Sequence, residues 1–212
     1  MIPLNRYYLS FFAFSLFLLT MPSCSSISYL KINYKVPEKI NLLEGKKVFL
    51  EIRDSRSDKD VLGEGAKADL KNLSDSISLS ITEGNEKGFK IGLFPLKSLM
   101  QEVFKERLKS LGLEVVTDQG ESGELPYVVI DLQSFKLDLV KTTLKSTWTA
   151  TMAYNVEISK KGKVLAGNKI NGESERMKII QKKEADTLLS ELITDLANRL
   201  DGAVLFKQAG II

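Results

Sequence analysis

The chain has 212 residues, of which 43% are hydrophobic and 27% are charged. Its 30 Lys and Arg residues nearly balance its 27 Asp and Glu residues, and the two signs are interspersed, which excludes the strongly basic surface of a nucleic-acid-binding protein. The chain contains no histidine, so it lacks the commonest general base and the commonest transition-metal ligand. We therefore expect no histidine-dependent catalysis, no metal site and no cofactor.

The beginning of the chain has the composition of an export signal. Arg6 precedes an uncharged apolar run, residues 7–21. This run is about 15 residues long, whereas a transmembrane helix needs roughly 20 and the apolar part of a signal peptide needs only 7–15. We predict a signal peptide over residues 1–23.

The end of this run is similar to a bacterial lipobox. In a lipobox a small residue precedes a cysteine that receives diacylglycerol and then becomes the new amino terminus, and the segment here is Met21-Pro22-Ser23-Cys24. The resemblance implies lipidation of Cys24 with S-diacylglycerol and N-palmitoyl groups, and Ser25 after it implies passage to the outer membrane. Cys24 is the only cysteine, so it cannot form an internal disulfide. The alternatives are an ordinary secretory signal with a chance cysteine, and an uncleaved anchor.

Lipidation would attach the protein to the membrane without a spanning helix, because several acyl chains on one residue hold it permanently. Residues 24–44 mix Ser, Lys, Asn and Pro with isolated apolar residues, and no period of 2 or 3.6 persists there. We interpret residues 24–44 as the lipidated amino terminus and a tether, and residues 45–212 as a single α+β domain.

Short strands open this domain. Residues 46–53 place Val48, Leu50 and Ile52 on one face, which predicts a strand. Residues 76–82 alternate Ser or Thr with Ile or Leu, and residues 89–93 continue the alternation after a turn, so the two segments form a predicted hairpin. If residues 76–82 are an edge strand, their hydroxyl-lined face could pair with another protein. The alternative is a face covered by solvent.

The rest of the domain predicts two helices and a meander. Apolar stripes predict amphipathic helices over residues 95–111 and 183–201. Alternation over residues 125–176 predicts three consecutive antiparallel strands, with a bulge near Gln133-Ser134 where the parity shifts. Residues 204–206 form a short hydrophobic tail. The predicted fold class is α+β, an antiparallel β-sheet meander with the two amphipathic helices packed on one face.

The charged loop at residues 54–65 is the one segment whose spacing is similar to that of a metal-binding motif. Asp58, Asp60 and Asp69 stand at offsets 1, 3 and 12 of a calcium-loop template, but Leu62 occupies an offset that should supply an oxygen. We therefore interpret the loop as solvated, with Asp and Arg side chains that bond to one another and to the backbone.

The order of these elements resembles the YajG-type lipoproteins, which are outer-membrane lipoproteins of diderm bacteria. The segments that carry the resemblance are Cys24, Ile52-Arg53-Asp54-Ser55-Arg56 leading to Leu62-Gly63, Leu99 to Phe104 with Leu111-Gly112, Ile130-Asp131-Leu132, and Leu205-Phe206-Lys207-Gln208. The resemblance implies an anchored accessory protein of the cell envelope with no assigned activity and no catalytic residues. It leaves Asp54 and Arg56 as a candidate partner loop, with a purely structural role as the alternative.

Three functions are compatible with this sequence. The first is a non-enzymatic binding or assembly module that is anchored in the envelope, on either its periplasmic or its surface-facing side, and recognises an envelope protein or polymer. The second is an envelope hydrolase that cleaves glycan or peptide with carboxylates such as Asp54 and Asp131, which would have to converge with raised pKa values. The third is an accessory lipoprotein of a lipid transport system, which an apolar groove between sheet and helix would favour.

Overall fold

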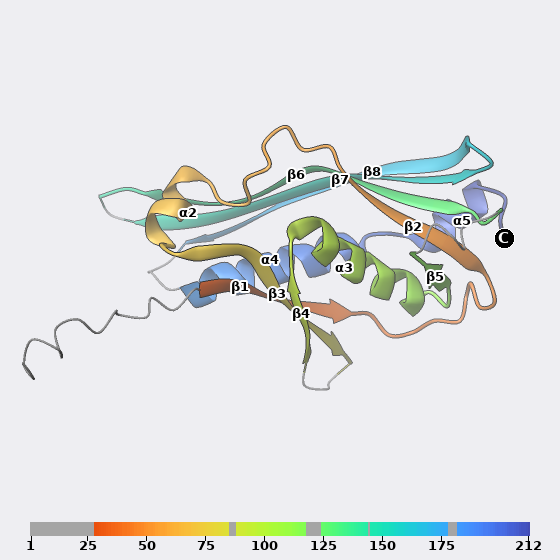
Figure 1. The fold of residues 1–212 in the computed structure, drawn as a ribbon, viewed down its shortest axis with the longest axis horizontal. Helices are drawn as coiled ribbons and strands as arrows, with labels where there is room; N and C mark the ends of the chain where they lie inside the picture. Colours follow the sequence, from red (N-terminus) through yellow and green to blue (C-terminus); the bar gives the residue numbers. More distant parts are fainter. Residues whose placement is uncertain (1–27, 85–87, 118–123, 144, 178–181) are drawn as a thin grey trace, which may run out of the picture.

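A computed structural model describes residues 28–84, 88–117, 124–143, 145–177 and 182–212. Along the chain its elements are β1 (Ser28–Val36), β2 (Lys47–Asp54), α2 (Glu64–Asp69), β3 (Leu73–Glu83), β4 (Phe89–Phe94), α3 (Leu96–Ser110), β5 (Glu114–Val116), β6 (Tyr127–Lys141), β7 (Ser146–Lys160), β8 (Lys163–Met177), α4 (Lys182–Asn198) and α5 (Gly202–Gln208). They form two sheets and the helices between and around them, so the α+β class is confirmed (Figure 1).

The larger sheet has five strands in the order β5-β2-β6-β7-β8. Strands β6, β7 and β8 pair antiparallel as the predicted meander, and their register shifts between Leu132 and Ser134, where the sequence predicted a bulge. The prediction of a wholly antiparallel sheet is wrong, because β2 runs parallel to both β5 and β6. A short parallel pairing of this kind leaves no turn signal in the sequence, since its strands are joined by long connections.

Helices α3 and α4 lie on one side of the five-stranded sheet, as predicted (Figure 1). Helix α3 packs against β2 and β5, and α4 packs against β7 and β8. The largest fully buried side chains of this core include Trp148 and Tyr154 from β7 and Phe104 from α3. The predicted hydrophobic tail at residues 204–206 is instead part of helix α5, whose first turn is capped by the Asp201 carboxylate accepting from the Val204 amide at 3.1 Å.

Residues 28–36 are not a tether, because they form β1 of a second, three-stranded sheet with the order β1-β3-β4. Strand β1 runs parallel to β3 and turns Leu30, Ile32 and Tyr34 into the core, where each is at most 1% exposed. The alternation of these apolar residues with Lys31, Asn33 and Lys35 is the period-2 pattern of a half-buried strand. The folded domain therefore begins by Ser28, well before the predicted boundary at residue 45.

One side of β1 would be a free edge if α4 did not cover it. The Lys31 amide donates to Asp186 Oδ1 at 2.9 Å and the Asn33 amide to Ser190 Oγ at 2.9 Å. The contact is repeated two residues further along β1, where the Lys35 amide donates to Thr194 Oγ1 at 3.2 Å. Two strand residues advance about 6.6 Å and four helix residues about 6.0 Å, so the two repeats stay in step over these three contacts. The helix thus satisfies backbone donors that would otherwise invite another strand.

Helix α2 is held against β6 at a position where only glycine fits. The amides of Gly65 and Ala66 donate to Asp138 Oδ1 at 3.1 and 3.2 Å. A Cβ on Gly65 would stand 1.8 Å from the backbone oxygen of Leu139, far inside van der Waals contact.

We expect Gly65→Ala to lower the free energy of unfolding by about 1–3 kcal/mol, because the new methyl group must push α2 off β6. Urea unfolding followed by the fluorescence of Trp148, the single tryptophan, measures the change. Gly167→Ala on β8 is the control, since its Cβ would lie 3.3 Å from the Val156 oxygen and needs a far smaller adjustment. Equal effects of the two substitutions would contradict the packing argument.

Candidate functional site

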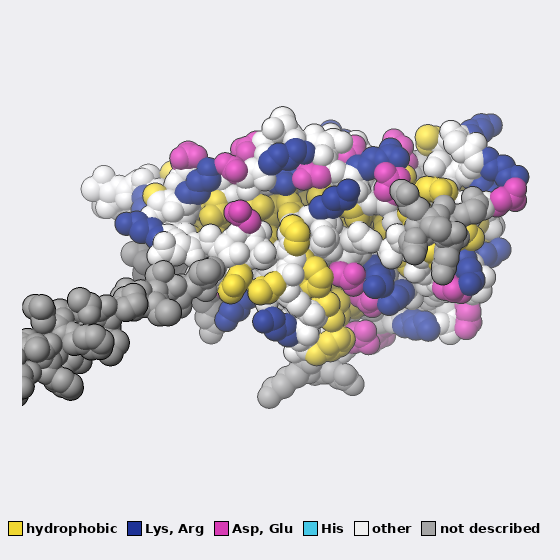
Figure 2. Space-filling model, viewed as in Figure 1, with side chains coloured by type: hydrophobic (Ala, Val, Ile, Leu, Met, Phe, Trp, Pro, Cys, Tyr) yellow, Lys and Arg dark blue, Asp and Glu magenta, His cyan; other side chains and the backbone are white. Residues whose placement is uncertain are grey.

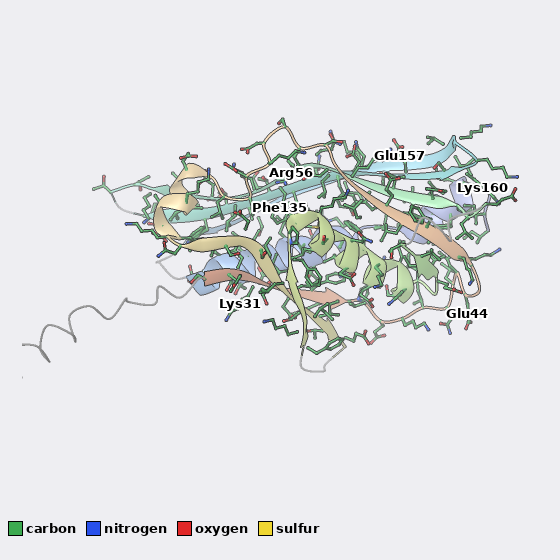
Figure 3. The ribbon with its side chains drawn as sticks, viewed as in Figure 1. Lys31, Glu44, Arg56, Phe135, Glu157 and Lys160 are labelled. Carbon is green, nitrogen blue, oxygen red and sulfur yellow. The ribbon has the colours of Figure 1, made fainter. Side chains whose placement is uncertain are left out.

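The predicted partner loop begins with a buried ion pair. Arg56 is 5% exposed, and its guanidinium donates from Nε to Asp54 Oδ1 at 2.9 Å and from Nη2 to Asp54 Oδ2 at 3.0 Å. Its Nη1 donates to the backbone oxygen of Phe135 on β6 at 3.4 Å, and both residues are labelled in Figure 3. Lys59 adds a contact from its Nζ to Asp54 Oδ1 at 3.2 Å. The structure therefore brings the sequence-predicted residues Asp54 and Arg56 together.

This ion pair lies where β2 leaves the sheet. The pairing of β2 with β6 ends at Asp54 opposite Leu132, and the chain then returns to β6 through an isolated bridge between Leu62 and Leu137. The Leu137 amide donates to Val61 at 2.8 Å, and the Gly63 amide donates to Leu137 at 2.8 Å. Between these two attachments, Arg56 ties the loop to the β6 carbonyl next to the bulge. The Asp54–Arg56 ion pair therefore acts as a structural clamp that holds the loop against β6.

The same ion pair holds the pKa of Asp54 at about 2, down from 3.8, chiefly because the Arg56 side chain donates to the carboxylate. Partial burial raises the pKa but is outweighed by Arg56 and Lys59. A carboxyl group with a lowered pKa is ionised throughout the neutral range. It is therefore a poor general acid.

Acid should weaken the fold through this group. Since the folded-state pKa of Asp54 lies below its unfolded-state value, its contribution to stability is complete above about pH 4 and is lost as the pH falls toward 2. The midpoint urea concentration of the wild type should fall over this interval more steeply than that of Asp54→Asn, which takes up no proton at this site. Glu51→Gln, which removes the exposed pair with Arg53, is the matched control and should change the slope less. Parallel curves for wild type and Asp54→Asn would contradict the assignment.

The second candidate carboxylate, Asp131, lies on the other face of the sheet. It stands opposite Arg53 in the register of β2 and β6, whereas the neighbouring Asp54 stands opposite the buried Leu132. Because successive strand residues point to opposite faces, the two carboxylates point away from each other. Asp131 instead accepts from Gln133 Nε2 at 2.7 Å. The pair Asp54 and Asp131 does not converge and is not arranged as a general acid and base.

The three aspartates of the calcium-loop spacing are also separated. Asp58 pairs with Lys136 at 2.5 Å, Asp60 pairs with Lys67 at 2.6 Å, and Asp69 pairs with Lys141. Within the described ranges, no group of three or more Asp, Glu, His or Cys side chains is placed to hold a metal ion. The loop is thus a set of lysine–carboxylate contacts, consistent with the interpretation of a solvated loop.

The small sheet has a free strand edge with exposed apolar side chains. Residues 76–82, for which the sequence left an edge position open, lie within β3, which is the central strand of this sheet. The edge belongs to β4, where Phe89 is 55%, Ile91 37% and Leu93 43% exposed. Figure 2 shows hydrophobic side chains gathered along β4 on the face that is viewed. This edge is the candidate interaction surface, and we call it the β4 edge (residues 89–94).

The β4 edge carries two features that bear on pairing. Its register with β3 shifts so that Gly92 stands opposite Leu79 and Lys90 opposite Ser80, which leaves Ile91 as the extra residue of a bulge. In the described part of the chain, no strand pairs with its outer side. The alternation of Phe89, Ile91 and Leu93 was visible in the sequence, but the same pattern describes a buried strand, so exposure could not be deduced from it.

A cavity of about 570 Å³ opens between the start of α3, the loop that carries Arg56, and strands β1 and β3. Its lining includes buried leucines and several exposed lysines. This cavity is the feature nearest to the apolar groove that would favour the lipid-transport alternative, although charged residues also line it.

Cys24 and the predicted signal peptide lie outside the described residues, so the lipidation of Cys24 stays a prediction. The described domain begins at Ser28, only four residues after Cys24. Among the helices of the described ranges, none combines the length and apolarity needed to cross a membrane.

No protein-family model matches this sequence, and a comparison with curated proteins finds no match. Among solved structures, a protein from Xanthomonas campestris described under the family model DUF330 superposes with a TM-score of 0.52 and 10% identity, over 87% of this chain and 97% of that one. A putative neuraminyllactose-binding hemagglutinin homolog from Helicobacter pylori gives a TM-score of 0.45 at 9% identity, over 82% and 92% of the two chains. A minor lipoprotein from Acinetobacter baumannii gives 0.39 at 11% identity, over 82% and 94%.

The likeness to the Xanthomonas campestris protein is a likeness of fold, because the identity is only 10%. It extends over 87% of this chain and 97% of that one, so it is a likeness of the overall fold and not of a single part. The narrower resemblance to YajG-type lipoproteins stays a prediction from the sequence.

Proposed function

We propose that this chain is a lipid-anchored protein of the bacterial cell envelope, located in the outer membrane, and that its domain is a non-enzymatic binding module. The observation that carries the binding role is the β4 edge, whose outer side pairs with no strand of the described ranges and which exposes Phe89, Ile91 and Leu93. The lipobox-like segment ending at Cys24 supports the anchor, and lipoproteins among proteins of broadly similar shape are compatible with it.

The β4 edge is suited to an extended protein segment. An added strand would take up the outer backbone donors and acceptors of β4, and apolar side chains on it would cover the exposed side chains of β4. Strand β8, at one edge of the five-stranded sheet, offers a contrast, because its exposed residues include Asn168, Lys169 and Glu173. Among its described side chains, strand β8 has one exposed large apolar side chain, Val164, whereas β4 has three along its length.

The bulge at Ile91 and the charge of Lys90 are features by which proteins limit indiscriminate edge pairing. They favour a partner whose strand matches the bulge over self-association through a flat edge. We therefore propose an envelope protein with an extended apolar segment as the partner.

A photocrosslinking amino acid at position 91 tests the binding surface in living cells. We expect one discrete protein adduct from position 91 and none from position 169 on β8, the matched free edge. Ile91→Lys should abolish co-purification of the identified partner, whereas Ile91→Val should keep it. Adducts of equal yield from both positions would contradict the assignment of the β4 edge as the binding surface.

Lipidation is tested separately with labelled palmitate. We expect label and membrane association in the wild type, and loss of both in Cys24→Ala, because Cys24 is the only thiol that can carry the lipid. Density-gradient separation of the two membranes then tests the outer-membrane assignment. Label that persists in Cys24→Ala would end the anchor proposal without touching the β4 edge.

The cavity beside α3 favours a second candidate, an accessory role in a lipid transport system. It provides the groove between sheet and helix that such a role requires, at a volume within the range of small-molecule sites. The hydrolase alternative has no comparable observation in its favour, because Asp54 and Asp131 lie on opposite faces.

A further inference from the structure

We propose that the cavity beside α3 is a binding site for an anionic phospholipid of the membrane that carries the protein, with the lipid phosphate at its lysine rim and part of one acyl chain on its apolar floor. The proposal rests on the proposed anchor at Cys24. It adds a ligand class and an orientation on the membrane that the binding-module function does not contain.

The floor of the cavity is apolar. Leu30 from β1 is 1% exposed, Ile77 from β3 is 1% exposed and Leu96 at the start of α3 is 6% exposed, and all three line the cavity. Leu70 and Leu73, on either side of the turn from α2 into β3, complete it. At about 570 Å³ the cavity can hold part of an acyl chain but cannot enclose a whole two-chain phospholipid.

The rim of the cavity is cationic. Two of its lysines are already matched, Lys59 by Asp54 and Lys67 by Asp60 and Glu64. Lys71 and Lys97 also line the cavity and are exposed, and within the described ranges neither takes part in an ion pair. One lining carboxylate, Asp75, is likewise without an ion pair there. Cations at the mouth of an apolar cavity match a phosphate at the head of an acyl chain.

The cavity lies at the end of the molecule nearest the anchor. The Ser28 amide donates to the Asn72 oxygen at 3.2 Å, and Ser28 stands opposite Leu73 in the register of β1 and β3, while Asn72 and Leu73 both line the cavity. Three residues lie between Cys24 and Ser28, so four steps of about 3.6 Å place the Cα atom of Cys24 within about 14 Å of that of Ser28 even if the chain is fully extended.

This short connection sets the orientation. An acylated Cys24 sits at the bilayer surface, where the headgroup layer is roughly 5–8 Å thick on each side. The β1 end of the domain, with its cavity, must then face the headgroups. The turn between β7 and β8, where Figure 3 labels Lys160, lies at the opposite end of the long axis and points away from the membrane.

A single-thiol probe tests this orientation and the access of lipid to the cavity. Because an acylated Cys24 leaves the chain without a free thiol, Ser74→Cys places one label in the cavity wall. Ser159→Cys places the same label at the far end of β7, as a matched serine replacement. In vesicles that contain phosphatidylglycerol with spin-labelled chains, we expect strong quenching of a fluorophore on Cys at position 74 and almost none at position 159. Equal quenching at both positions would overturn the orientation.

Lipid retained by the detergent-purified full chain tests the cavity apart from the anchor. We expect wild type to retain phosphatidylglycerol in native mass spectra, and the double variant Lys71→Glu with Lys97→Glu to retain about thirtyfold less, given roughly 1 kcal/mol for each lysine near an anionic surface. Lys160→Glu with Lys163→Glu at the far end should retain as much as wild type. Unchanged retention in the cavity variant would overturn the site.

Two further measurements distinguish a lipid phosphate from a free phosphate, and a failure of the anchor from a failure of the lipid site. Soluble glycerophosphate or inorganic phosphate that displaces the retained lipid at equal concentration would show an anion site without an acyl chain, and would overturn the phospholipid assignment. Absence of palmitate on Cys24 would end the proposed anchor and with it the orientation, whereas charge-dependent lipid retention in detergent would still support the cavity as a phospholipid site.

Discussion

Ile32→Ala should lower the free energy of unfolding by about 2–5 kcal/mol, the cost of removing a fully buried aliphatic side chain from a packed core. Ile32 is 1% exposed and lies between Leu30 and Tyr34 on the inner face of β1. Its loss would leave a void in the layer that joins the small sheet to the helices. The single tryptophan, Trp148, is fully buried, so its fluorescence reports the urea midpoint of the same core.

Lys31→Ala is the control for this substitution. Lys31 is exposed and next in the chain, and its contact with Asp186 is made by the backbone amide, which the substitution keeps. We expect a change within about 0.5 kcal/mol. If residues 28–36 were the tether that their composition indicates, both variants would be neutral. A neutral Ile32→Ala would therefore remove β1 from the folded domain.

The contrast between β1 and the meander shows what the sequence could predict. Strands β6, β7 and β8 follow one another, alternate over long runs and pair through local turns, so their pattern contains both the strands and their partners. Strand β1 pairs with β3, more than forty residues later in the chain, and α4 covers its edge from the far end of the sequence. Neither partner leaves a local signal, and the lysines and asparagine of its outer face made the segment look like a linker.

The polar stripe on α4 illustrates the same limit. Asp186, Ser190 and Thr194 recur every four residues, which on a helix surface reads as an ordinary solvated face. In the structure they accept from alternate amides of β1. Their role depends on the strand that lies beside them, and the sequence alone does not name that strand.

The candidate site likewise combines a local contact, which the sequence could indicate, with contacts between distant segments, which it could not. Asp54 and Arg56 are two residues apart, so their pairing could be anticipated, but the Phe135 oxygen that Arg56 also binds is 79 residues away in the chain. The β4 edge depends on which strand of the hairpin is outermost, and that was decided by β1 taking the other side of β3. With residues 28–36 interpreted as a tether, the sequence left an edge position open for residues 76–82, and the structure places β1 there instead.

Arg56→Ala should be among the most damaging single substitutions outside the apolar core, with a loss of about 3 kcal/mol in the free energy of unfolding. The substitution leaves the Asp54 carboxylate, itself only 20% exposed at the side chain, without its bidentate partner, and it frees the Phe135 oxygen. Lys59 still contacts Asp54, which keeps the loss at the lower end of the range for broken buried pairs. Urea unfolding at pH 7 measures the change.

Two substitutions separate the clamp from simple removal of charge. Arg56→Lys keeps the charge but cannot make two parallel bonds to Asp54 and a third to Phe135, so we expect it to recover less than half of the loss. Arg53→Ala removes the exposed pair of Arg53 with Glu51, whose side chains are 53% and 34% exposed respectively. It should lower the free energy of unfolding by only about 0–1 kcal/mol. If Arg56→Ala cost no more than Arg53→Ala, the loop would not be clamped at β6, and Asp54 and Arg56 would again be candidates for a partner contact. If Arg56→Ala costs more than Arg53→Ala, the role of the ion pair is to hold the loop and the adjoining wall of the cavity. The binding surfaces are then the β4 edge and the cavity.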